Sequence, residues 1–150
     1  AGHYWHTVVK TAPTPPYCFT LKMINHLSAQ WNRYGICLRQ SSDGKLIYWG
    51  HQFNNTTNGD RYQIVTGYTA YNGLENAFVY NATTAGYNKW WRIVNDNVNV
   101  FYKFSQDGIN WNTFYAHAKD IYITINEVGF CTDSNGSTGY YTVESWNQDY

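Results

Sequence analysis

Charge is scarce in this sequence, and the charges that it has cancel. Lys and Arg number 10, Asp and Glu number 10, and charged residues make up only 13% of the chain. A protein that binds the phosphate backbone of a nucleic acid needs a concentrated excess of basic side chains. The composition therefore argues against nucleic acid as a partner.

Long apolar runs are missing as well. No apolar stretch approaches the roughly 20 residues that a membrane-spanning helix needs, and no signal peptide of the basic, apolar and small-residue pattern is present. We therefore expect no membrane insertion. Because the chain begins with Ala1 and not with Met, we interpret it as a processed product or an excised piece.

Cysteine is rare and widely spaced, at Cys18, Cys37 and Cys131. None belongs to a CxxC pair or lies at a metal-ligand spacing from histidine, so neither a zinc site nor a redox motif is predicted. All three fall inside strand-like runs. This placement favours small buried side chains over a disulfide framework, although the pairing state stays open.

Aromatic residues, in contrast, are plentiful: they make up 19% of the chain, with Tyr 15 and Trp 7. Aromatic faces and amide side chains suit uncharged polar ligands, so this composition is typical of extracellular β proteins and glycan binders. It is equally typical of a plain β-rich domain.

The apolar residues alternate with polar ones, and clusters of Gly, Asn, Asp and Ser separate the runs, which predicts strands and not helices. Residues 1–16 form a Pro-rich, extended lead-in or edge segment. Residues 17–150 form a single domain, with ten predicted strands at 17–27, 33–40, 45–53, 61–70, 76–80, 89–95, 98–105, 111–117, 127–132 and 139–147. Strands of this number and spacing indicate an all-β sandwich or barrel.

The period of two sorts each strand into a core face and an outer face. On the strand at 89–95, Trp91 is assigned to the core together with Ile93, whereas Trp90 and Arg92 point outward. On the next strand, Phe101 and Lys103 point outward. Trp111 is interpreted as part of the frame or core, and the acidic residues Asp96 and Asp107 as turn formers.

Two patterns, W-x-R-I from Trp90 and V-x-V-x-Y-x-F-S-x-D-G-x-x-W from Val98, together resemble the concanavalin A-like lectin/glucanase superfamily. The likeness is nearest to laminin-G-like domains of bacteriophage structural proteins. In those domains a strand of the kind at 36–39 precedes a turn of the kind at 42–46, and a Val-Gly-Phe strand precedes a closing strand that ends in Ser-Trp. The resemblance implies an antiparallel jelly-roll β-sandwich and a virion or extracellular location.

Glucanases of this superfamily carry an E-x-D-x-E or E-x-D-x-x-E pattern, since one carboxylate attacks and another protonates the leaving oxygen. The three glutamates of this chain, Glu75, Glu127 and Glu144, have no acidic neighbour within four residues. We therefore predict that the chain is not an enzyme. The alternative that stays open is a carboxylate pair assembled across strands, such as Glu127 with Glu144.

Cofactors are predicted to be none. Calcium is the one alternative, because Asp133-Ser134-Asn135-Gly136 and Asp96-Asn97-Val98-Asn99 offer oxygen ligands. Ca²⁺ takes six to eight such ligands, and the D-x-D-x-D-G spacing is absent. Asx-stabilised turns are therefore the preferred interpretation of both segments.

The outward residues Trp90, Arg92, Phe101 and Lys103 predict a glycan-binding site on two adjacent strands. A planar aromatic ring beside a hydrogen-bonding cation can hold a pyranose ring, which has one apolar face and a rim of hydroxyls. The expected role is a non-enzymatic recognition or structural module of a phage tail fibre, receptor-binding or capsid-decorating protein. Alternatives are a structural homo-oligomeric virion subunit, in which the same face contacts other subunits, and a glycan-degrading enzyme.

Overall fold

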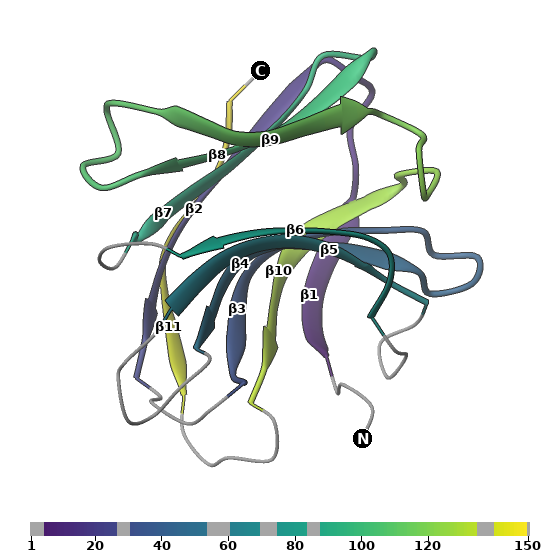
Figure 1. Cartoon of the computed structure of the whole chain (residues 1–150). Helices are drawn as coiled ribbons and strands as arrows, with labels where there is room; N and C mark the ends of the chain where they lie inside the picture. Colours follow the sequence, from purple (N-terminus) through teal and green to yellow (C-terminus); the bar gives the residue numbers. More distant parts are fainter. Residues whose placement is uncertain are drawn as a thin grey trace.

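The alternating runs of the sequence form eleven β-strands in the structure, a computed structural model (Figure 1). It describes residues 5–26, 31–53, 61–69, 75–83, 88–134 and 140–149, and at residues 25, 61–63 and 75–83 it describes the backbone alone. Every regular element within these ranges is a strand. A search of the same ranges for a helix that is long and apolar enough to cross a membrane finds none.

The strands form two antiparallel sheets that lie one above the other in Figure 1. Sheet A has six strands, in the order β1 (His6–Thr11), β10 (Glu127–Asp133), β3 (Arg33–Arg39), β4 (Leu46–Phe53), β5 (Arg61–Tyr68) and β6 (Glu75–Thr83). Sheet B has five, in the order β11 (Tyr141–Asp149), β2 (Tyr17–Asn25), β7 (Trp90–Asn95), β8 (Asn99–Ser105) and β9 (Asn112–Ala118). The prediction of an all-β, antiparallel jelly-roll sandwich is confirmed.

Strand β1 was not among the ten predicted strands. Its residues belong to the predicted lead-in or edge segment, and it pairs with β10 along its whole length, from His6 opposite Thr132 to Thr11 opposite Glu127. This pairing makes β1 an edge strand of sheet A. The division of the chain at residue 16 stays a prediction.

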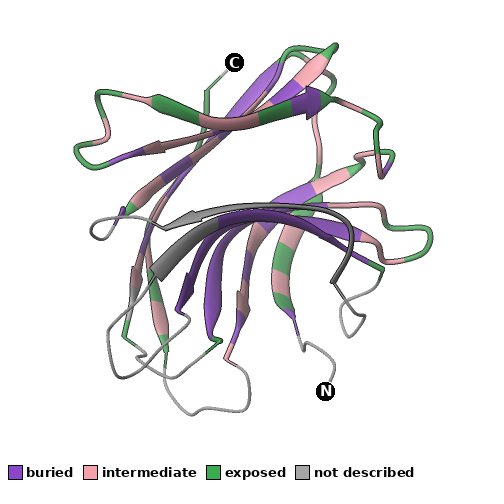
Figure 2. Ribbon diagram, viewed as in Figure 1, coloured by how far each residue is buried: buried purple, intermediate pink, exposed green. Residues whose placement is uncertain are grey.

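The main core lies between the two sheets and is built from large aromatic side chains. Trp49 of β4, Trp91 of β7 and Tyr102 of β8 are fully buried there. The indole N–H of Trp49 donates to the backbone carbonyl of Lys103 at 3.2 Å, so it ties β4 in sheet A to β8 in sheet B. Burial alternates strictly along β7, as a sheet with only one covered face requires (Figure 2).

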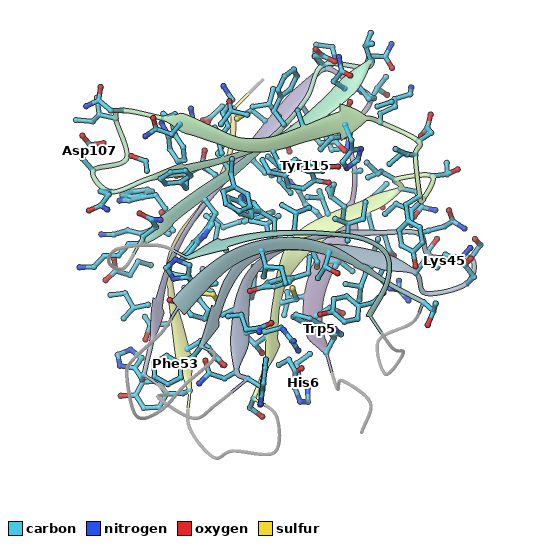
Figure 3. All side chains as sticks on the ribbon, in the orientation of Figure 1. Trp5, His6, Lys45, Phe53, Asp107 and Tyr115 are labelled. Carbon is cyan, nitrogen blue, oxygen red and sulfur yellow. The ribbon has the colours of Figure 1, made fainter. Side chains whose placement is uncertain are left out.

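The central strands of sheet A are buried on their other face as well. Every residue of β4 is buried, and on the side away from sheet B the ring of Trp5 packs over Tyr48 at 4.7 Å and Tyr68 at 5.1 Å between centroids. Figure 3 shows Trp5 beneath sheet A. Cys37 and Cys131 belong to this second cluster, and all three cysteines are buried, as predicted, and form no disulfide. Over its central strands, the far face of sheet A is therefore covered by packed side chains.

Turn chemistry accounts for the hairpins. The turn residues Gly44, Asn97 and Gly108 each have φ = 78°, in the left-handed region that glycine and asparagine tolerate. Asn97 joins β7 to β8 and Gly108 joins β8 to β9, so three neighbouring strands of sheet B follow one another directly in the chain.

Candidate functional site

The four residues of the predicted glycan site all lie on the outer face of sheet B. In the register of β7 with β8, Arg92 is opposite Lys103 and Val94 is opposite Phe101, and Trp90 is two residues before Arg92 on the same face. All four side chains are half-buried, whereas the intervening Trp91 is fully buried. The structure thus brings together the residues that the period of two predicted to point outward.

Arg92 is held in place from three sides. Its Nε donates to the hydroxyl of Thr20 on β2 at 2.9 Å, and its Nη2 lies 3.8 Å from a carboxylate oxygen of Asp149 on β11. Its guanidinium carbon lies 3.9 Å from the centre of the Trp111 ring, which is a stacking distance. The guanidinium is therefore oriented before any ligand arrives.

Trp90 is fixed by its neighbours in a similar way. The ammonium of Lys22 lies 5.1 Å from the centre of the Trp90 ring, and the same ammonium forms an ion pair with Glu144 at 2.5 Å. On another side the ring meets the β8–β9 turn, where a Cβ added to Gly108 would lie only 2.9 Å from Trp90 Cε2. The absence of a side chain at Gly108 thus makes room for the indole.

Trp111 is a member of the site that the sequence interpretation missed. It was interpreted as frame or core, but it is only half-buried and stacks on Arg92. The reason is a bulge in the pairing of β8 with β9: Tyr115 is opposite Tyr102, yet Thr113 is opposite Lys103, so the strand changes phase at Phe114. We call Trp90, Arg92, Phe101, Lys103 and Trp111 the aromatic–cation patch.

Asp96 and Asp107 act as turn formers, as predicted. One carboxylate oxygen of Asp107 accepts hydrogen bonds from the backbone N–H groups of Ile109 and Asn110, both at 2.8 Å. These bonds, together with those from the Asn110 amide and Ser105, hold the pKa of Asp107 well below its usual range. Hydrogen bonds from the backbone of Asn99 and then Val98 likewise lower the pKa of Asp96.

The carboxylate pair that was named as an example, Glu127 with Glu144, does not form. Glu127 lies on β10 of sheet A, where it forms an ion pair with Arg39, whereas Glu144 lies on β11 of sheet B beside Lys22. A dyad for glycoside hydrolysis needs its carboxyl groups about 5 to 9.5 Å apart. Two outward-facing glutamates on different sheets of a sandwich, whose layers alone are about 10 Å apart, do not meet that requirement.

The calcium alternative falls partly outside the described residues, since Asn135 and Gly136 are not among them. Asp133 is buried and lies 3.5 Å from the guanidinium of Arg33. Among the described residues, no three His, Cys, Asp or Glu side chains gather as a metal site. The prediction of no cofactor stays a prediction.

A separate hollow of about 260 Å³ opens where the edges of the two sheets meet. Its lining comes from β1, β10, β2 and β11 and includes the apolar side chains of Val8, Met23, Phe130 and Val143. No residue of the aromatic–cation patch lines it. The hollow and the patch are therefore different surfaces.

A scan against protein-family models and a search of curated proteins both find no match for the chain. Solved structures do match. A functionally unknown protein from Saccharomyces cerevisiae aligns with a TM-score of 0.69 and 13% identity over 99% of this chain and 74% of that chain. The GH43 BlXynB protein from Bacillus licheniformis aligns with a TM-score of 0.69 and 14% identity, over 95% of this chain but 29% of that one. A variant of an ancestral congerin aligns with a TM-score of 0.53 and 9% identity, over 99% of this chain and 97% of that one.

These matches correct one prediction. The chain was predicted not to be an enzyme, and the match to part of a GH43 glycosidase contradicts that prediction, because the same fold occurs within a glycosidase chain. At identities of 9 to 14% the likeness concerns the fold. The chain is an antiparallel β-sandwich.

Proposed function

We propose that this protein binds a carbohydrate on the outer face of sheet B, with the aromatic–cation patch as the binding surface. The observation that carries the proposal is the stacking of Arg92 on Trp111 beside the half-buried Trp90. Rings provide apolar faces for the carbon side of a sugar, and the cations beside them provide donors for its hydroxyls.

The contrast between the two outer faces supports this choice. On the outer face of sheet A, the rings of Trp5, Tyr48 and Tyr68 are buried against one another. On sheet B, in contrast, the rings of the patch remain partly accessible. Side chains already oriented by Thr20 and Asp149 also lose less conformational freedom when a ligand binds. The likeness of the fold to a congerin is consistent with carbohydrate as the ligand class.

The test is a glycan array followed by calorimetry on Trp90→Ala. We expect affinity to fall about tenfold or more, because a stacked aromatic face is worth about 1 kcal/mol beyond its buried area. The matched control is Trp31→Ala, since Trp31 is 41% exposed and precedes β3 of sheet A. Loss of binding in the control, with binding retained in Trp90→Ala, would move the site away from the patch.

The same variant separates the alternative in which the patch contacts other subunits. If the wild-type protein is a homo-oligomer that dissociates on Trp90→Ala and binds no glycan, the patch is a subunit interface. New reducing ends on a bound polysaccharide would instead indicate cleavage. The virion or extracellular location and the role in a phage fibre stay predictions.

A further inference from the structure

We propose that the ligand of the aromatic–cation patch is an acidic polysaccharide, whose carboxylate or sulfate group is bound between Arg92 and Lys103. This inference rests on the proposed function and adds the chemical class of the sugar. It begins with an unfavourable feature of sheet B: two cations face each other across neighbouring strands.

Arg92 of β7 and Lys103 of β8 are direct partners in the antiparallel register. Side chains that are directly opposite have Cβ atoms about 4.5 to 5.5 Å apart, and like charges in this arrangement destabilise a sheet. The two side chains lie over different rings: Arg92 stacks on Trp111, and the Lys103 ammonium lies 6.0 Å from the centre of Phe101. An anion between them would convert the repulsion into two favourable contacts.

The charges around this pair do not neutralise it completely. Glu144 is engaged by Lys22 at 2.5 Å, and Asp149 is the carboxylate near Arg92 at 3.8 Å. Within the part of the chain that the structure describes, no ion pair joins Lys103 to a carboxylate. Three cations (Lys22, Arg92, Lys103) against two carboxylates leave one positive charge on this face, and it belongs to Lys103.

The rings lie on both sides of the cation pair along the strands. Trp90 lies two residues from Arg92 on β7. Phe101 lies two residues from Lys103 on β8, toward the opposite end of the antiparallel pair. From Trp90 to Val94, the partner of Phe101, the strand rises about 13 Å. A chain of sugars along the strand direction would thus stack its rings near both ends and place an acidic substituent at the centre.

Matched polysaccharides test the charge separately from the sugar. Binding of polygalacturonate is compared with binding of its methyl ester, and dextran sulfate with dextran, by calorimetry at low and high salt. For the wild-type protein we expect at least one acidic member to bind about tenfold more tightly than its neutral partner. That preference should shrink as salt is added, because exposed charges are screened.

Lys103→Met removes the ammonium and keeps most of the apolar stem. We expect the ratio of acidic to neutral affinity to fall by about tenfold, close to one. Lys45→Met is the matched control, since it removes the same charge at the β3–β4 turn, far from sheet B's outer face (Figure 3). Circular dichroism of Lys103→Met, and of a second neutral variant, Lys103→Gln, shows whether a loss of affinity comes from misfolding.

Three outcomes would overturn the inference. Equal affinity for acidic and neutral partners that is lost in Trp90→Ala leaves the proposed function standing and removes only the acidic preference. If the ratio of acidic to neutral affinity falls as far in Lys45→Met as in Lys103→Met, the protein attracts the polysaccharide by its overall charge and not at a specific site. If the protein binds none of the four polysaccharides but binds neutral glycans of an array, the acidic class is excluded. If it binds no glycan at all, the proposed function is rejected together with the inference.

Discussion

At His117 two hydrogen bonds decide which ring nitrogen carries the proton. Nδ1 lies 2.7 Å from the carbonyl oxygen of Ala118, which can only accept, so Nδ1 bears the hydrogen. Nε2 is then the acceptor for the hydroxyl of Tyr102 at 2.8 Å. The inward position of His117 on β9 buries the imidazole, and burial lowers its pKa from the ordinary 6.5.

This shift predicts how stability depends on pH. Because the folded pKa of His117 lies below 6.5, the unfolded chain binds the proton first as pH falls. The contribution of the neutral ring to the free energy of unfolding is fully present above pH 6.5. It is lost as the pH falls from 6.5 toward the pKa of His117 in the folded protein. We expect the free energy of unfolding, measured in urea, to decrease over that range.

His117→Asn isolates this contribution, since the other histidines are shared by both proteins. The variant should be less stable at neutral pH by about 1–3 kcal/mol, because the buried Tyr102 hydroxyl loses its acceptor. The difference in unfolding free energy between the wild type and the variant should become smaller as the solution is acidified below pH 6.5. A difference that stays constant with pH would contradict the assignment.

At the scale of elements, the β8–β9 turn positions one side of the patch. Gly108 has a positive φ and lies against Trp90. Gly44 has the same φ of 78°, but a Cβ added there would lie 3.9 Å from its nearest neighbour, the guanidinium of Arg39. Each Gly→Ala change should cost about 1–2 kcal/mol of unfolding free energy from the left-handed backbone. Gly108→Ala should cost more than Gly44→Ala, because it also displaces the indole.

The same pair of variants tests whether the turn supports binding. Gly108→Ala should weaken glycan affinity by moving Trp90, and Gly44→Ala should leave that affinity unchanged because it lies at the β3–β4 turn. Calorimetry and tryptophan fluorescence measure the two effects. Equal stability and equal affinity in both variants would show that the turn has no role in placing the ring.

Elements also show where prediction from the sequence ended. The strict alternation of β7 correctly divided Trp90 and Arg92 from Trp91, since a strand with one covered face has a period of two. Trp111 was interpreted as frame or core, but the bulge at Phe114 reverses the phase of β9 and places Trp111 on the outer face. Nothing in the local sequence marks the bulge, which places both Phe114 and Tyr115 against the core.

At the scale of the whole molecule, the two sheets are covered unequally. The central strands β3 and β4 of sheet A are buried on both faces, by the main core and by the cluster around Trp5 (Figure 2), whereas the rings on the outer face of sheet B are half-buried. The three cysteine side chains lie out of solvent within this arrangement. Burial also raises the pKa of the Cys131 thiol well above its ordinary value.

We therefore predict that Cys18, Cys37 and Cys131 do not react with a thiol reagent such as 5,5′-dithiobis(2-nitrobenzoate) while the protein is folded. Burial blocks the access of the reagent to all three, and at Cys131 it also disfavours the thiolate, which is the reactive form. In guanidinium chloride all three should react rapidly. Fast reaction of any one in the native protein would mean that its strand opens locally without global unfolding.

The sequence by itself determined the all-β class, the turns at Gly44, Asn97 and Gly108, and the division of β7 into an inner and an outer face. These features depend on backbone conformation and on neighbours two residues apart, which the sequence displays directly. Only the tertiary structure decided that Trp111 joins the patch and that β1 becomes an edge of sheet A.

The tertiary structure also decided that Glu127 and Glu144 lie on different sheets and that Trp5 packs on the far face of sheet A. Each of these outcomes depends on pairing between residues far apart in the chain. Which strands become neighbours is set by the burial of whole sheet faces, so one residue's local pattern does not determine it.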